Sequence, residues 1–254
     1  MSPQVSANST ASSRRGLLRG MAAGGLVAGA GLTLGAAPAV AAPRRASRRS
    51  STWVAPNTPA LAIRELFVEG NARWKIQAQT HPREYAGDRT PLVTAQHPWA
   101  MIVSCIDSRV PPELIFDQGL GDLFVSRTAG QVLDEAVLGS TAYAARESSV
   151  KLIVVLGHHK CGAVKAAIDK KDNVPGLPNP YPARLTFLTN AIAGAIPPAG
   201  TPNRENVAIN ENVRRIRNQL LLEPDIAPRV AAGTLEVIGA RYELDTWIAH
   251  QIAP

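Results

Sequence analysis

The stretch AMIVSCIDSRV, Ala100–Val110, decides the fold because an apolar run leads directly into a group of reactive side chains. The run Ala100–Val103 is typical of a buried β-strand. Cys105, Asp107 and Arg109 follow at alternate positions, so a thiol, a carboxylate and a guanidinium gather where this strand should end. Charged side chains are rarely buried in a core. The pattern therefore predicts a functional site at the carboxyl end of the strand.

Three further apolar runs resemble the first one, at Asp122–Ala129, Val150–His158 and Thr234–Leu244. Segments with helical periodicity precede or separate the runs. Near-continuous apolar strands that alternate with helices are typical of a parallel sheet covered on both faces. We therefore expect an α/β fold with a mostly parallel central sheet of about four strands, flanked by helices, and an N-terminal helical arm. The expected helices lie within Pro59–Thr80, Asp134–Ser149, Cys161–Lys171 and Asn203–Leu221.

The chain has two cysteines, Cys105 and Cys161, and each lies near the carboxyl end of an expected strand. Ligands bind at this edge of open parallel sheets. His158 precedes Cys161 by three residues, a spacing that lets an imidazole and a thiolate converge on one ion. Two thiolates and one imidazole form the three-ligand set of a catalytic zinc site with an open fourth position. The alternative interpretation is one disulfide in an exported protein.

Asp107 and Arg109 acquire a role beside such an ion. The carboxylate of Asp107 is expected to be either a fourth ligand or the acceptor of a hydrogen bond from a zinc-bound water. A bidentate pair with Arg109 would keep the carboxylate ionised and control which of the two roles it plays. The alternative for an Asp and an Arg two residues apart is a surface ion pair.

The positive charge of the chain is concentrated at its N-terminus. The formal net charge is +7 over 254 residues, but residues 1–50 hold seven arginines and no acidic residue. The rest of the chain has 20 basic and 20 acidic residues, and this balance argues against nucleic-acid binding. The seven arginines are Arg14, Arg15, Arg19, Arg44, Arg45, Arg48 and Arg49.

The N-terminal segment has the pattern of an export signal. SRRGLLRG, Ser13–Gly20, resembles the twin-arginine motif, a weakly apolar run follows at Met21–Ala37, and Ala39–Ala41 is a small-residue cleavage site. The short, Gly/Ala-rich run favours a removable signal over a membrane anchor. We expect a protein that is secreted or located in the periplasm or cell envelope and that contacts a membrane only during export. The expected parts are a twin-arginine signal peptide at 1–41, a disordered linker at 42–55 and a folded domain at 56–254.

The segments Cys105–Gly130 and Gly139–Ile168 closely resemble the β-class carbonic anhydrases. The likeness extends from about Ala60 to Leu244. It implies that residues 56–254 form a β-carbonic anhydrase domain. It also implies a homodimer or a larger homo-oligomer in which an N-terminal helical arm wraps the partner.

The resemblance assigns a role to each residue of the two motifs. It implies that Cys105, His158 and Cys161 are the ligands of one zinc ion per chain. It makes Asp107 and Arg109 the catalytic dyad, with Asp107 on the metal in a closed state only. Both resting states, Asp107 on the zinc and Asp107 held off it by Arg109, are compatible with the sequence.

The activity implied by the resemblance is reversible hydration of CO₂ to bicarbonate and a proton. Zinc lowers the pKa of its bound water to about 7, and the resulting hydroxide attacks CO₂ in an apolar pocket. Substrate contacts are assigned to Gly162 and to Tyr143, the latter across the dimer interface. The family's RNAGN is RTAGQ here, Arg127–Gln131, and its GSIEYAV is GSTAYAA, Gly139–Ala145, so the chain departs from the family near the pocket.

Other functions are compatible with parts of this pattern. An enzyme of the same fold that hydrolyses carbonyl sulfide or carbon disulfide shares the ligand set. A non-catalytic zinc or dithiol redox protein needs the two cysteines, but it needs neither Asp107 nor Arg109. His159, next to the expected ligand, is either a proton shuttle or an exposed residue at a helix start.

Overall fold

The computed structural model describes residues 54–84, 86–148 and 150–252. The expected signal peptide, its cleavage site and nearly all of the expected linker lie outside the described residues. Among the described residues, no helix is long and apolar enough to cross a membrane.

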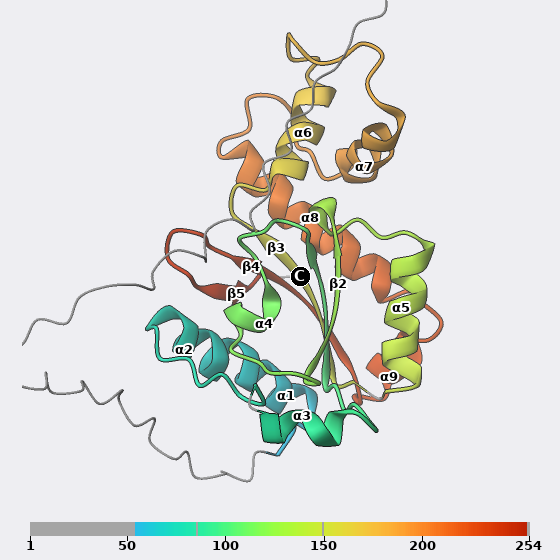
Figure 1. Cartoon of the computed structure of the whole chain (residues 1–254). Helices are drawn as coiled ribbons and strands as arrows, with labels where there is room; N and C mark the ends of the chain where they lie inside the picture. The colour runs from blue at the N-terminus through green and yellow to red at the C-terminus, as the bar shows by residue number, and fades with distance from the viewer. Residues whose placement is uncertain (1–53, 85, 149, 253–254) are drawn as a thin grey trace, which may run out of the picture. The chain divides into compact units, whose positions relative to one another are not determined.

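The described chain is built around one five-stranded sheet with the order β2-β1-β3-β4-β5 (Figure 1). The first four strands in this order pair in parallel, which confirms the expected fold class. The fifth strand was not expected because it is three residues long; it pairs antiparallel with β4 at one edge. The strands are β1 Ala100–Cys105, β2 Leu123–Thr128, β3 Leu152–His158, β4 Glu236–Tyr242 and β5 Ala249–Gln251.

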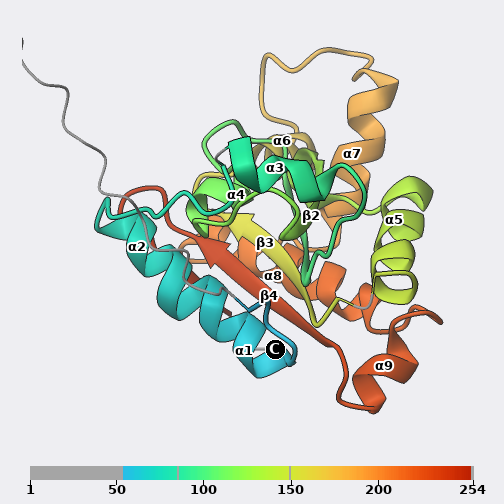
Figure 2. The same cartoon turned by 60° about the horizontal axis from the view of Figure 1, so that its bottom comes forward.

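Helices cover both faces of the sheet, as long buried parallel strands require. On one face, α1 Pro59–Ile63, the π-helix η1 Arg64–Gly70 and α2 Asn71–Lys75 follow one another without a break and form the N-terminal helical arm (Figure 2). This arm and α4 Pro112–Ile115 bury Leu66, Ile115 and Phe116 against Ile102 and Val154 of the sheet. The π-helix ends at Gly70, where a Cβ atom would lie 1.9 Å from the carbonyl oxygen of Phe116, so only glycine allows this close approach.

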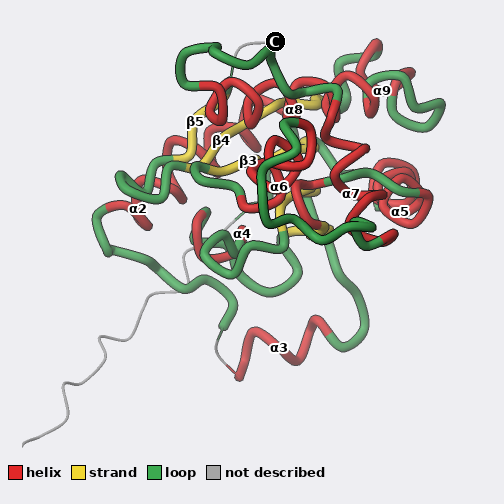
Figure 3. Tube along the Cα trace, turned by 90° about the horizontal axis from the view of Figure 1, so that it is seen from above, coloured by secondary structure: helices red, strands yellow, loops and turns green. Residues whose placement is uncertain are grey.

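The opposite face is covered by three other helices, and Figure 3 shows α8 and α4 on opposite sides of the strands. α8 carries Val213, Ile216 and Leu220 into a core that includes Ile153 and Val155 of β3. The helices of this face are α5 Glu135–Arg146, α8 Arg204–Leu220 and α9 Ala227–Ala231. The short α3, Ala86–Leu92, lies between the arm and β1 in sequence.

A third cluster lies at the carboxyl ends of the strands, where α6 Gly162–Lys171 and α7 Ala183–Ala193 pack against each other (Figure 1). Its buried members include Cys105, Cys161 and Ile192. α7 arises within the Pro- and Gly-rich segment 172–203, which showed no clear periodicity in the sequence. This cluster surrounds the edge of the sheet at which the functional site was expected.

Candidate active site

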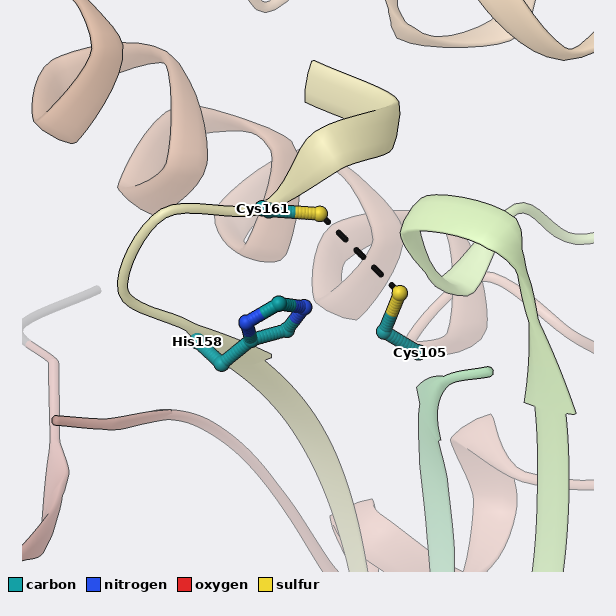
Figure 4. Close-up of side chains that lie close together, drawn as sticks. All are labelled: Cys105, His158 and Cys161. Atoms are coloured by element: carbon teal, nitrogen blue, oxygen red, sulfur yellow. Dashed lines mark hydrogen bonds between the residues drawn. The ribbon is translucent and has the colours of Figure 1, made fainter. Parts of the chain in front are cut away.

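Three side chains converge at the carboxyl edge of the sheet (Figure 4). Cys105 is the last residue of β1 and His158 the last residue of β3; these strands are neighbours and parallel, so they end at the same edge. Cys161 is the N-cap residue of α6 and lies three positions after the end of β3. The sulfur atoms are 4.0 Å apart, and all three candidate ligand atoms lie within 4.8 Å of one another. All three residues are buried.

The hydrogen bonding of His158 leaves one ring nitrogen free for an ion. Nδ1 of His158 lies 3.0 Å from the carbonyl oxygen of His159. A carbonyl oxygen only accepts, so Nδ1 carries the proton and Nε2 keeps its lone pair. Nε2 is buried and has no hydrogen-bond partner. A metal-binding histidine is held in this way by a partner on its other nitrogen, so the residue fits a metal.

The two cysteines are free thiols joined by one hydrogen bond between their sulfur atoms. The hydrogen bond between the two sulfur atoms lowers the pKa of Cys105 to about 4, and the backbone N–H of Gly130, 3.3 Å from Sγ of Cys105, adds to this. The same interaction and burial raise the pKa of Cys161, and the N–H groups of Val164 and Ala163 partly oppose the rise. Sulfur atoms 4.0 Å apart are well beyond the disulfide bond length of about 2.05 Å. The pair is suited to share one cation.

Asp107 and Arg109 form the bidentate pair that the motif predicted. Nε of Arg109 donates to Oδ1 of Asp107 at 2.9 Å, and a terminal nitrogen donates to Oδ2 at 2.7 Å. These bonds lower the pKa of Asp107 to about 2. The pKa is depressed, so the pair is intact above the unfolded pKa of about 3.9 and is lost only as the pH falls toward 2. Oδ2 of Asp107 lies 3.9 Å from Nε2 of His158, so the carboxylate stands beside the ligand set.

Arg127 supports this loop from the neighbouring strand, a role that the sequence analysis missed. Its guanidinium donates to the carbonyl oxygens of Cys105, at 2.8 Å, and Asp107, at 2.5 Å. The positive charge at this point of RTAGQ was the available signal. The contacts hold the backbone on both sides of Ile106, and the loop therefore presents the Cys105 and Asp107 side chains in one orientation.

An apolar cavity of about 290 Å³ opens beside Cys105 and Asp107. Gly162, expected to contact the substrate, lines this cavity next to Ala163. Ile106, Ala129 and Ala166 also line it. Four further lining residues come from α7 and the segment just before it, and they were not among the expected site residues because no helix was expected there. These residues are Tyr181, Leu185, Leu188 and Thr189.

Two other candidate residues lie apart from the cavity. Tyr143 lines a different groove, between β2 and α5, where its ring meets that of Phe124 edge-on with centroids 6.2 Å apart. Within one chain it does not line the cavity beside Cys105. His159 is about one fifth exposed, and its Nδ1 faces Glu243 at 3.9 Å and Asp245 at 4.0 Å.

Comparison with known proteins agrees with this geometry. The carbonic anhydrase family model matches residues 100–247. The chain is 40% identical over 194 residues to the carbonic anhydrase of Mycolicibacterium smegmatis, covering 74% of this chain and 91% of the relative. Carbonic anhydrase 2 of Mycobacterium tuberculosis is 39% identical over 196 residues, with coverages of 75% and 91%. The solved β-carbonic anhydrase CcaA superimposes with a TM-score of 0.57 at 25% identity, over 74% of this chain and 97% of that one.

The chain therefore belongs to the carbonic anhydrase family, in its β class. Its activity is that of a carbonate dehydratase, which hydrates CO₂ reversibly. β-Carbonic anhydrases are zinc enzymes, and the Cys105, His158 and Cys161 group can bind a metal.

Proposed function

We propose that this protein is an exported, zinc-dependent carbonic anhydrase that hydrates CO₂ at the Cys105, His158 and Cys161 site. The observation that carries the proposal is the free, buried Nε2 of His158 among two thiol sulfurs, with all ligand atoms within 4.8 Å. A buried nitrogen without a partner costs free energy unless a ligand satisfies it. Two sulfur donors and one nitrogen donor favour Zn²⁺ over Mg²⁺ or Ca²⁺.

A bound Zn²⁺ supplies a Lewis acid that brings the pKa of a coordinated water to about 7. The rest of the chemistry belongs to the chain. Asp107, held ionised by Arg109, accepts a hydrogen bond from the attacking water and orients it toward the cavity. The apolar cavity, with Leu185 and Leu188 in its wall, holds the apolar substrate and limits access by bulk water. The product proton then passes to solvent or buffer.

The direct test is metal analysis together with stopped-flow CO₂ hydration on the zinc-loaded full chain. We expect one zinc per chain and hydration well above the uncatalysed rate. The same preparation is then assayed with carbonyl sulfide and carbon disulfide. If either of these is turned over efficiently while CO₂ is not, the substrate assignment is wrong although the zinc site stands.

A redox protein would behave differently in the same preparation. It would lack metal and contain a Cys105–Cys161 disulfide, which free-thiol counting under denaturing conditions detects. We expect two free thiols per chain when the protein as purified is denatured with a chelator and without any reductant. We also expect hydration to be restored when zinc is added back to a zinc-depleted sample. The intact Asp107–Arg109 pair supports the enzyme, because structural zinc requires neither residue.

We also propose that two copies associate through the groove between β2 and α5. β2 is an edge strand of the sheet, and the groove of about 560 Å³ presents the 54% exposed Tyr143 with Met101 and Phe124. Exposed aromatic side chains of this kind are enriched at protein interfaces. Tyr143→Asp should reduce the molecular mass measured by light scattering to that of a monomer, whereas Leu222→Asp, at an 82% exposed position, should not. An unchanged mass in the Tyr143 variant would place the interface elsewhere.

Export is proposed from the leader, which lies outside the described residues. The twin-arginine route carries folded proteins, so the domain would bind zinc before it leaves the cytoplasm. Replacing Arg14 and Arg15 together with lysine should leave the full-length chain, with its leader attached, in the cytoplasmic fraction. Fractionation and immunoblotting measure this result. Normal export of the double variant would contradict the twin-arginine assignment and favour a general secretory signal.

A further inference from the structure

We propose that Asn212 is a positioning residue for the metal centre, because it orients Gly130 so that the Gly130 N–H donates to Sγ of Cys105. This inference rests on the proposed zinc site. Asn212 lies in α8 and is 2% exposed. Its Nδ2 donates to the carbonyl oxygen of Gly130 at 2.9 Å, and the Gly130 N–H lies 3.3 Å from Sγ of Cys105.

The backbone at Gly130 needs such an anchor. Gly130 has φ 66° and ψ 25°, and the next residue, Gln131, also has a positive φ of 49°. A non-glycine residue in this region persists only where the surrounding structure supports it. A Cβ atom at Gly130 would lie 2.7 Å from Cδ1 of Ile192 and 3.2 Å from Cβ of Ala163, so the turn packs closely against α6 and α7. The hydrogen bond from Asn212 holds the peptide group between Gly130 and Gln131. It thereby restricts the preceding peptide group, which carries the Gly130 N–H, to one orientation.

The N–H to sulfur bond has a chemical consequence at the ligand. A hydrogen bond to a thiolate draws electron density from the sulfur and orients it, as outer-shell partners of metal ligands do. Sγ of Cys105 is buried, so the bond acts in a medium of low dielectric and is strengthened. Asn212 is neutral, and it therefore influences the electron density and orientation of the Cys105 sulfur without adding charge to the site.

The test compares Asn212→Leu with Asn71→Leu in the full chain. Leucine has the same branched side-chain skeleton as asparagine, although it is larger, and it has no hydrogen-bond donor. Asn71 is a matched control, because it is 3% exposed and also donates from Nδ2 to backbone carbonyls, those of Ile115 and Trp247, yet it lies in the N-terminal arm. Asn212→Asp is a second variant of the same size in case the leucine variant does not fold.

The readouts are the rate at which zinc passes to a chelator and the sulfur-to-cobalt charge-transfer band of the Co²⁺-loaded protein. Loss of an outer-shell partner costs about 10- to 100-fold in metal affinity, so zinc loss from the Asn212 variants should be at least about tenfold faster. The charge-transfer band should move to lower energy, because the sulfur lone pairs are no longer stabilised. Asn71→Leu should lower the Tm and change neither readout.

Wild-type zinc loss and an unmoved band in a folded Asn212 variant would overturn the inference. Equal changes in the Asn71 variant would also overturn it, since they would indicate general destabilisation. If the wild-type chain itself binds neither Zn²⁺ nor Co²⁺, the proposed function fails, and this is seen before any variant is compared.

Discussion

Replacing Cys105, His158 or Cys161 with alanine should abolish zinc binding and CO₂ hydration together. Each side chain supplies one of only three ligand atoms in the group, and all three converge within 4.8 Å. Two remaining donors do not complete the three-ligand set of a catalytic zinc site. We expect zinc content near zero after dialysis and a hydration rate at the level of the uncatalysed reaction. Metal analysis and stopped-flow hydration on the same samples measure both.

His97→Ala provides the matched control for the histidine variant. His97 is exposed and lies before β1, outside the ligand group. Its replacement should leave zinc content and hydration unchanged. Full zinc occupancy in one of the three ligand variants would remove that residue from the ligand set.

Arg109→Ala should keep the zinc and lose the activity. Arg109 holds both oxygens of Asp107, one of which lies 3.9 Å from Nε2 of His158. Once released, the ionised carboxylate can occupy the open coordination position and exclude water. CO₂ hydration should fall by about 10²-fold or more. Added thiocyanate or bicarbonate should fail to bind the metal of the Co²⁺-loaded variant, because the carboxylate already occupies the open position, and its visible spectrum should therefore not change.

Asp107→Ala separates the two roles of the carboxylate. This variant also keeps all three ligands, but the coordination position stays open and only the hydrogen-bond acceptor is missing. The rate should fall by about 10² to 10⁴, the range typical of a positioned acid–base group. Thiocyanate should still reach the metal. The two variants thus differ in anion binding although both are inactive.

Arg204→Ala is the control for the loss of a bidentate arginine–aspartate pair. Arg204 donates two hydrogen bonds to Asp172 at the protein surface, on the first turn of α8. This pair lies outside the ligand group, so the variant should hydrate CO₂ at the wild-type rate. Wild-type activity in Arg109→Ala would mean that the Asp107–Arg109 pair is an ion pair without a part in the reaction.

Much of the architecture was predictable from local patterns. The four apolar runs form the four parallel strands. A strand that is buried on both faces needs apolar side chains at consecutive positions, and such a run is visible in the sequence. β5 was missed because three residues, Ala249–Gln251, carry too short a pattern. α7 was missed because prolines and glycines surround its weakly periodic sequence, and packing against α6 stabilises it instead.

By itself, the sequence determined the class of fold and the residues that could bind a metal. Hydrophobic runs and the spacings of Cys105–Arg109 and His158–Cys161 are properties of neighbouring residues, and parallel strands must end at one edge. Only the tertiary structure decided which ring nitrogen of His158 is free and which α7 side chains line the cavity. It also decided that Asn212 contacts Gly130. Asn212 and Gly130 are 82 positions apart. Contacts across such a separation follow from how helices pack on the sheet, and the local sequence pattern does not encode them.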